Sequence, residues 1–392
     1  MKFRFLLLIF SVFILGNISN GAPLEIIAQK ILEQGPETIS EGFEMGRAYS
    51  NLAVAANLPD PEVGGEYLFA PESEDNRWAA EVTWGVEWPG VYGARKKEAK
   101  SQVDATEKMI YGRRVERLAE IKGLLLDYIR CEKKLSLLEE LNANNDSIYK
   151  LAEQSHRGGE MTVLDLHKVK LEYANIRGAK AALLDEETGV VQQLSAIYGK
   201  DCRVLLASLD CEFPEVILPT EEQIASIGEK APSVIESRAK EETAAKGMKV
   251  AGLEALPSLS VGYKHAYEEM THFNGAILGV SIPIFSNRGK KKQAEVDYLD
   301  SRFQTDRAIN EAETEAEISV RRLRQLDSQI KEVATIVDHA DYNATLLKAY
   351  NGGVITLIEY LTDRNYFTTA AMELVNLQHT AARLQVSLSK YF

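Results

Sequence analysis

Apolar side chains alternate with polar or small ones in short segments of the chain. Over 81–88 and 259–267 alternate positions are mostly apolar, a period typical of a strand with one apolar face. Weaker alternation over 63–69 and 276–284 supplies each segment with a partner. The sequence therefore predicts two strand hairpins. Their polar loops are expected at 71–77 and 268–274.

Helical periodicity occupies most of the remaining chain. Residues 90–213 and 284–392 contain no proline, which favours long helices because an interior proline removes a helix hydrogen bond. Outgoing helices are predicted over about 95–157 and 290–351, each roughly 90 Å long at 1.5 Å per residue. Apolar steps of three and four residues predict coiled-coil seams, one at Leu118, Ile121, Leu125 and Tyr128 and another from Leu374 to Tyr391.

The two patterns recur together at a constant separation of 194 residues. Gly85-Val86 matches Gly279-Val280, Gly158-Gly159 matches Gly352-Gly353, and no gap is needed between these points. A constant offset indicates a duplicated structural unit. We expect a first repeat at 22–219 and a second at 220–392, intertwined in one domain.

The first residues have the pattern of a secretory signal. Lys2 and Arg4 precede an apolar run over 5–15, and small residues stand at 19 and 21. The run is shorter than the roughly 20 residues that cross a bilayer as a helix. We therefore expect a signal peptide at 1–21.

Composition and motifs argue against several classes of function. The net charge of −13 disfavours a nucleic-acid partner and, in a conduit, would favour cations. No nucleophile elbow, phosphate loop, dinucleotide fingerprint or metalloprotease motif is present, so we expect no enzyme, no cofactor and no metal site, including at His156 and His167. Cys202 and Cys211 could form a disulfide or could both be free thiols, and the sequence is compatible with either alternative.

Four strands leave two open edges, and four strands cannot enclose a lumen. Strands in an outer membrane must close into a barrel, so several copies would have to share one. The apolar strand positions would then face lipid. These positions are Val82, Trp84, Val86, Leu259, Val261, Tyr263, Leu278, Val280 and Ile282.

Two motifs resemble the TolC family of outer-membrane efflux proteins. The patterns His156-x-x-Gly159-x-x-Thr162-x-x-Asp165 and Tyr350-x-x-Gly353-x-x-Thr356-x-x-Glu359 are similar to the family's aromatic-x-x-Gly-x-x-Ser/Thr-x-x-Asp pattern. The passage 280–289 is similar to its apolar-Pro-apolar-Phe run. The resemblance implies a mainly α fold with a small β part, in which long coiled-coil hairpins and four strands per protomer form a trimeric β-barrel on an α-helical barrel.

The resemblance also implies a function and its partners. The chain would be a passive exit duct of a tripartite efflux or type I secretion system in the Gram-negative outer membrane, extending into the periplasm. A homotrimer would bind a periplasmic adaptor protein and an inner-membrane pump. The entrance gate would involve Asp165, Glu359 and Asp363. The adaptor would contact Arg157, Gly158, Gly159, Glu160, Asn351, Gly352, Gly353 and Val354.

A periplasmic coiled-coil scaffold or adaptor-like protein is the alternative. It would explain the helical seams and the signal, but not the four amphipathic strands. A secreted enzyme is a third hypothesis, with no constellation of catalytic residues to support it. Membrane fractionation separates the first two hypotheses.

Overall fold

The computed structural model describes residues 22–69, 76–283, 287, 289–337 and 342–392. The predicted signal peptide at 1–21, most of the predicted loop at 71–77 and part of the 280–289 passage lie outside these residues. The long helices are α1 (Leu24–Gln34), α2 (Glu37–Val54), α3 (Val91–Arg157), α4 (Val163–Tyr198), α8 (Pro232–Glu254), α9 (Lys290–Val337), α10 (Tyr342–Asn351) and α11 (Leu357–Ser389). Three short helices are α5 (Arg203–Leu206), α6 (Glu221–Ala225) and α7 (Ile227–Lys230).

The four strands form one antiparallel sheet in the order β1-β2-β3-β4. Both predicted hairpins are confirmed, and the second strand of each starts earlier than the alternation indicated. The turn between β3 and β4 contains only Glu269 and Met270, with φ of 50° and 59°. Positive φ at both central residues gives this two-residue turn the twist that suits a hairpin. The bounds are β1 (Glu62–Leu68), β2 (Arg77–Val86), β3 (Ser258–Glu268) and β4 (Thr271–Ser281).

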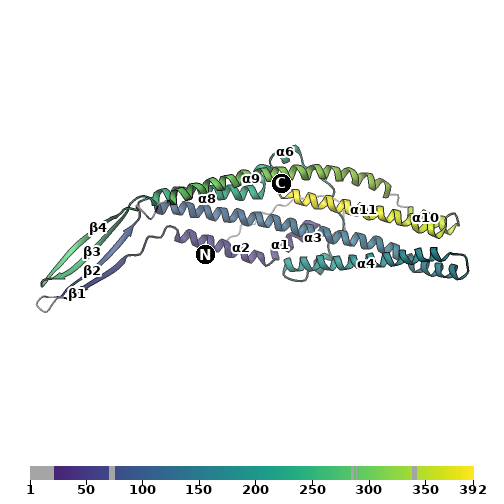
Figure 1. Cartoon of the computed structure of the whole chain (residues 1–392), viewed down its shortest axis with the longest axis horizontal. Helices are drawn as coiled ribbons and strands as arrows, with labels where there is room; N and C mark the ends of the chain where they lie inside the picture. The colour runs from purple at the N-terminus through teal and green to yellow at the C-terminus, as the bar shows by residue number, and fades with distance from the viewer. Residues whose placement is uncertain (1–21, 70–75, 284–286, 288, 338–341) are drawn as a thin grey trace.

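The molecule is long, with the sheet projecting at one end and both helical tips lying at the other (Figure 1). Near the sheet, α3 packs between α2 and α8, and α9 packs on the far side of α8. Towards the tips, α3 packs on α4 and α9 packs on α11. At 67 residues, α3 is about 100 Å long at the α-helical rise.

Corresponding elements of the two repeats keep the separation seen in the sequence. α4 begins at Val163 and α11 begins at Leu357, and β2 pairs with β3 in the middle of the sheet, where the repeats meet. The second outgoing helix has its predicted limits, Lys290 and Asn351, in α9 and α10. The structure thus contains each expected element twice, although the assignment of the domain limits at 22–219 and 220–392 stays a prediction.

Buried apolar side chains along the helices provide the packing that stabilises this shape. One cluster joins α1, α3 and α4 around Ile31, Ile121, Leu125 and Leu194, which are fully buried. A second joins α7, α9 and α11 around Leu323 and Ala381. Both predicted seams contribute to these clusters, since burial of one apolar stripe is what stabilises a long helix in water.

An ion-pair cluster joins the sheet to the helices. Arg95, in the first turns of α3, lies 2.7 Å from the carboxylate of Glu87 just after β2 and 2.5 Å from that of Glu254 at the end of α8. Burial alone would lower the pKa of Arg95, but hydrogen bonds from its guanidinium to the two carboxylates raise it. The guanidinium therefore stays charged and links three elements at the point where the sheet begins.

Candidate functional site at the hairpin tips and the exposed sheet

The first hairpin tip is a Schellman turn. The Glu160 N–H donates to the Ser155 carbonyl at 2.9 Å, and the Gly159 N–H donates to the His156 carbonyl at 3.0 Å. Gly159 has a φ of 79°, a conformation that glycine adopts without a Cβ clash. His156 also donates from Nδ1 to the Met161 carbonyl at 2.9 Å, which explains a polar ring at the first motif position.

The second tip repeats this geometry. The Val354 N–H donates to the Ala349 carbonyl at 2.9 Å, the Gly353 N–H donates to the Tyr350 carbonyl at 3.0 Å, and Gly353 has a φ of 68°. Tyr350 stacks on Tyr360 with ring centroids 5.4 Å apart. The chain thus reverses direction at Gly159 in the first hairpin and at Gly353 in the second, the two glycines of the sequence motifs.

The motif threonines begin the returning helices. The Glu359 N–H donates to the Thr356 hydroxyl, and the Glu359 carboxylate accepts from the Thr356 N–H at 2.8 Å, which completes a capping box. Thr162 caps α4 by accepting from the Asp165 N–H at 3.1 Å, and its hydroxyl donates to the Asp165 carboxylate at 2.8 Å. The predicted gate carboxylates therefore also fix the starts of α4 and α11.

Hydrogen bonding keeps both carboxylates ionised. The Thr162 hydroxyl and then Lys168 lower the pKa of Asp165, while the backbone and side chain of Thr356 lower the pKa of Glu359. Asp363 lies one turn further along α11 and is partly exposed. The structure thus places three acidic residues next to the tips, and their role at an entrance stays a prediction.

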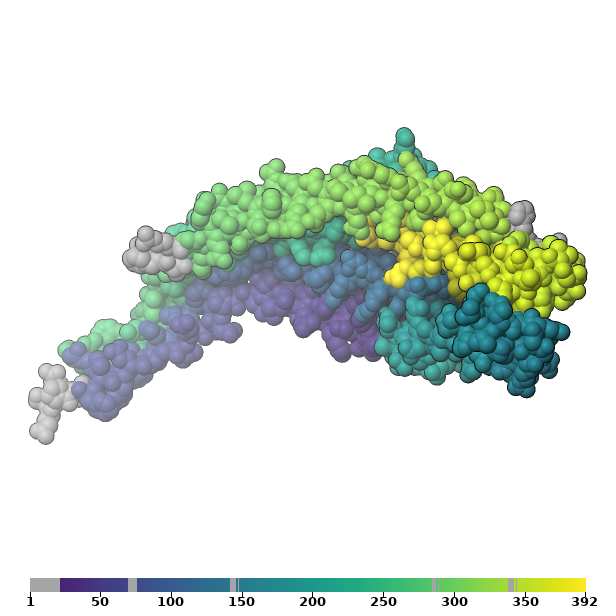
Figure 2. All heavy atoms as spheres, turned by 45° about the vertical axis from the view of Figure 1, so that its right-hand side comes forward, coloured from purple at the N-terminus to yellow at the C-terminus, as the bar shows by residue number. Residues whose placement is uncertain are grey.

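The two tips pack against each other, so the predicted site is one surface. Leu166 from α4, Leu346 from α10 and Tyr360 from α11 share one buried cluster. Figure 2 shows the ends of the two hairpins side by side at one extremity. All eight predicted adaptor-binding residues are exposed, among them the apolar Val354 at 78%. A further apolar side chain, Leu164 near the start of α4, is 74% exposed.

At the opposite end, one face of the sheet is apolar and exposed. The register places Trp84 beside Val261 and Val261 beside Leu278, and side chains paired in this way project to the same face. No helix packs broadly on the described strands. Eight of the nine predicted lipid-facing residues share this face, and Ile282 follows β4 by one residue: Val82, Trp84, Val86, Leu259, Val261, Tyr263, Leu278 and Val280.

The other face of the sheet carries the charged side chains. Glu81 pairs with Lys264 across β2 and β3, and Arg77 forms a 2.6 Å ion pair with Glu268. An uncovered apolar face opposite a charged one is the reverse of a soluble sheet, where apolar side chains lie against a core. This arrangement fits a sheet whose apolar face meets lipid.

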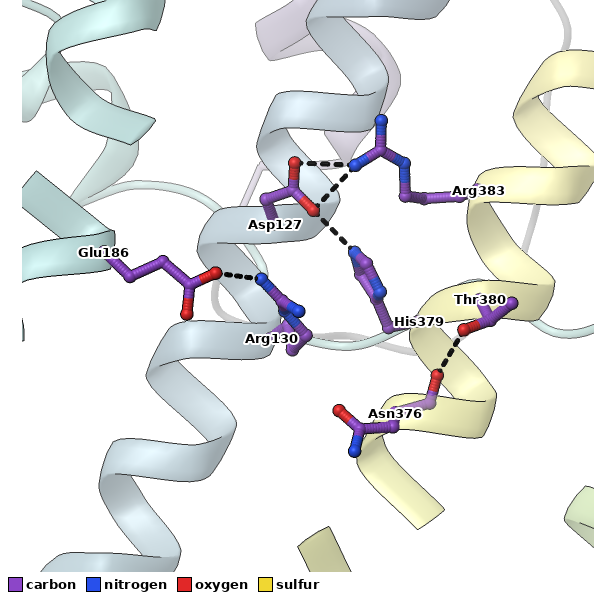
Figure 3. Close-up of polar contacts among 7 residues, drawn as sticks. All are labelled: Asp127, Arg130, Glu186, Asn376, His379, Thr380 and Arg383. Atoms are coloured by element: carbon purple, nitrogen blue, oxygen red, sulfur yellow. Dashed lines mark hydrogen bonds and ion pairs between the residues drawn. The ribbon is translucent and has the colours of Figure 1, made fainter. Parts of the chain in front are cut away.

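A partly buried polar cluster joins α3 and α11, and the sequence patterns do not predict it. Asp127, 13% exposed, accepts from His379 Nε2 at 2.7 Å and from Arg383 Nη1 at 2.8 and 2.9 Å (Figure 3). Burial would raise the pKa of Asp127, but the hydrogen bond from His379 and the charge of Arg383 hold it below its usual value. No local signal predicts this cluster, because its members lie more than 250 positions apart.

The described residues contain no group of three or more His, Cys, Asp or Glu side chains arranged as ligands for one metal ion. The thiols of Cys202 and Cys211 are free, with Cys202 buried. Among the helices that the structure describes, none is both long and apolar enough to cross a membrane.

Comparison with known proteins identifies the fold. No protein-family model and no curated protein matches the chain. Among solved structures, a membrane protein from Pseudomonas aeruginosa superposes with a TM-score of 0.79 at 15% identity, over 94% of this chain and 89% of its own. The CmeC outer membrane channel of Campylobacter jejuni gives 0.78 at 14% identity, over 94% and 85% of the two chains. The MtrE outer membrane channel of Neisseria gonorrhoeae, in its open state, gives 0.72 at 13% identity, over 94% and 88%.

At these identities the likeness establishes the architecture. The chain has the fold of TolC-like outer-membrane channels over nearly its whole length, so the resemblance indicated by the two tip motifs is confirmed at that level.

Proposed function

We propose that the chain is the outer-membrane exit duct of a tripartite efflux or type I secretion system. The observation that carries this proposal is the uncovered apolar sheet face joined to a helical shaft about 100 Å long. The sheet would lie in the outer membrane and the shaft would cross the periplasm. The solved channels with the same fold support this orientation.

The duct would act as a homotrimer. β1 and β4 are the edges of the sheet in one chain, and their free backbone groups would be costly in lipid unless each edge paired with another copy. Three copies would give twelve strands, enough for a closed barrel with a lumen. The acidic, charged face of the sheet would then line the lumen.

The internal repeat supports a particular pairing of helices between neighbouring copies. Within one chain α11 packs on α3, the second helix of one repeat on the first helix of the other. If the second helix of one repeat also packs on the first helix of the other repeat between copies, α4 of one copy lies against α9 of the next. These two helices make no extended contact within one chain.

The charges at this contact are complementary. At the separation of 194 residues, Asp127 corresponds to Arg321 and His379 corresponds to Asp185. The pair between copies would therefore have an acidic residue on α4 and a basic residue on α9. Asp185 is exposed in the single chain. Among the residues that the structure describes, Arg321 forms an ion pair with Glu317 one turn away, in which both side chains are 71% exposed. We infer that Arg321 of one copy faces Asp185 of its neighbour.

Cysteine cross-linking tests this arrangement. In a Cys211→Ser background, oxidation of a chain carrying Asp185→Cys and Arg321→Cys should give covalent dimers and trimers on a non-reducing denaturing gel. The pair Asp127→Cys and His379→Cys should close a bridge inside one chain and leave its mass unchanged. If the first pair gave only monomers while the second pair closed, copies would not assemble in this way.

The tips would bind a periplasmic adaptor protein that connects the duct to an inner-membrane pump. Backbone at exposed glycine pairs can be approached closely, and Leu164 and Val354 supply apolar contacts beside them. Chemistry is not required of a passive conduit, and we propose no catalytic activity. A periplasmic scaffold or adaptor-like protein is the alternative, but such a protein would leave the apolar sheet face exposed to water.

A further inference from the structure

Two histidines meet on the apolar face of the sheet, beside the β3–β4 turn. His272 Nδ1 lies 3.2 Å from His265 Nε2, and the two ring planes are inclined by 22° with centroids 5.2 Å apart. The register pairs Tyr267 with His272 and His265 with Asn274, so the two imidazoles are diagonal neighbours on adjacent strands. The hairpin therefore brings together two nitrogens from residues that the sequence places seven positions apart.

A neighbouring amide fixes the proton on one ring. His265 Nδ1 lies 2.7 Å from Asn274 Oδ1, which also accepts from the Tyr263 hydroxyl. Since a carbonyl oxygen only accepts, Nδ1 of His265 carries the proton and Nε2 has a free lone pair directed at His272. A hydrogen bond from the second ring nitrogen to a fixed oxygen is the arrangement by which proteins orient a histidine that binds a metal ion.

The separation of the two nitrogens suits chelation. Two imidazole nitrogens bound to one Zn²⁺ at about 2.0–2.1 Å and near the tetrahedral angle are roughly 3.3 Å apart. The observed separation is 3.2 Å. To bind the ion, His272 would give up the hydrogen bond that it now donates to His265. Its ring proton would pass from Nδ1 to Nε2 by exchange with water, and the lone pair left on Nδ1 would become the second ligand.

Neither the sheet nor the turn needs these two imidazoles. The turn is formed by Glu269 and Met270, and the ladder hydrogen bonds of β3 and β4 come from the backbone. The surrounding side chains on this face, Trp78 and Tyr267, are aromatic. Glu268 projects to the other face, where it pairs with Arg77, so it is not a third ligand in this arrangement.

We propose that His265 and His272 form a binding site for a transition-metal cation of the Zn²⁺ or Cu²⁺ class, with Asn274 as the positioning residue. Imidazole favours these ions, and Cu²⁺ binds such ligands more strongly than Zn²⁺, whereas Mg²⁺ and Ca²⁺ prefer oxygen. With two protein ligands, water would occupy the remaining positions and the ion would exchange. The site does not depend on the proposed conduit and requires only the β3–β4 hairpin.

Calorimetric titration of Zn²⁺ into the full chain, purified without a histidine tag, tests the site. One ion should bind per chain, Mg²⁺ in excess should not displace it, and His265→Ala or His272→Ala should abolish saturable binding. Asn274→Ala should weaken binding about 10- to 100-fold, the usual effect of removing a residue that orients a ligand. His272→Gln keeps a polar side chain at the position and should lose binding without altering the far-ultraviolet circular dichroism.

The matched control is His167→Ala, since His167 is an exposed histidine on α4 at the other end of the molecule. It should leave binding unchanged. The electron paramagnetic resonance spectrum of Cu²⁺ should show coupling to two imidazole nitrogens in the parent chain, and this two-nitrogen signal should be absent from His272→Gln. Absence of Zn²⁺ binding to the parent chain, or equal binding in the parent and in correctly folded His272→Gln, would overturn the proposal.

Discussion

A charge placed on the apolar face of the sheet tests the membrane assignment of that face. Val82 lies near the middle of β2, between Val63 on β1 and Tyr263 on β3, so Val82→Arg puts a guanidinium in the centre of the apolar band. Arginine at the bilayer midplane of an outer-membrane barrel costs about 2–4 kcal/mol. At about 1.4 kcal/mol per tenfold, the folding equilibrium should fall roughly 30- to 700-fold per copy.

Two matched variants make this test specific. Thr83→Arg adds the same charge on the opposite face, where Thr83 pairs with Glu62, and should cost little. Tyr267→Arg stays on the apolar face but lies beside the hairpin turn, where the cost near the interface is about 0–1 kcal/mol. The assay is urea-induced unfolding of the purified chain in lipid vesicles, compared by transition midpoints. Equal destabilisation by Val82→Arg and Thr83→Arg would refute a lipid-facing assignment of this face.

Three further predictions concern the tips and the α3–α11 contact. Gly159→Asp with Gly353→Asp should abolish efflux without lowering the yield of trimer, because an added Cβ meets nothing within 4 Å and the positive φ costs only about 1–2 kcal/mol per residue; efflux that survived both changes would contradict adaptor binding at the tips. Glu359→Gln with Asp363→Asn should reduce cation selectivity and divalent-cation block in a planar bilayer, since glutamine preserves the capping box while removing charge; unchanged selectivity would rule out the acidic gate. Folding lowers the pKa of Asp127, so its carboxylate stabilises the fold above the unfolded pKa of about 3.9, and this stabilisation is lost as pH falls through the folded pKa. Asp127→Asn should therefore reduce the dependence of the unfolding midpoint on pH between pH 5 and 2. The same dependence on pH in the variant and the parent would contradict this contribution.

Local patterns in the sequence were sufficient to predict the tips. The predicted outgoing helices end at 157 and 351, directly before the glycine pairs. The positive φ of Gly159 and Gly353 depends on a few consecutive residues, so a short motif contains the information needed. The apolar face of the sheet is predictable for a similar reason, because apolar residues recur at every second position within each strand.

The β3–β4 turn shows where local patterns failed. The polarity of residues 268–274 predicts a loop, but these residues continue both strands through a turn formed by Glu269 and Met270, without the usual glycine or asparagine. Strand polarity near a membrane surface does not distinguish a loop from a strand end. The histidine pair was missed for the same reason.

Contacts between distant segments were beyond the sequence patterns. Asp127 meets His379 because α11 packs on α3, and a single sequence contains no signal for which helix faces which. Once one such contact is known, the repeat predicts its counterpart at Arg321 and Asp185. The duplication in the sequence thus predicts a contact between copies only when it is combined with a contact that the structure shows within one chain.

Fractionation of cells that express the chain tests the central claim most directly. After separation of inner membrane, outer membrane and periplasm, the account predicts that the protein lies in the outer membrane. It should run as a band of three copies on an unheated gel and collapse to a single chain on heating. Soluble periplasmic protein, or a membrane protein that runs as a single copy without heating, would contradict the trimeric duct.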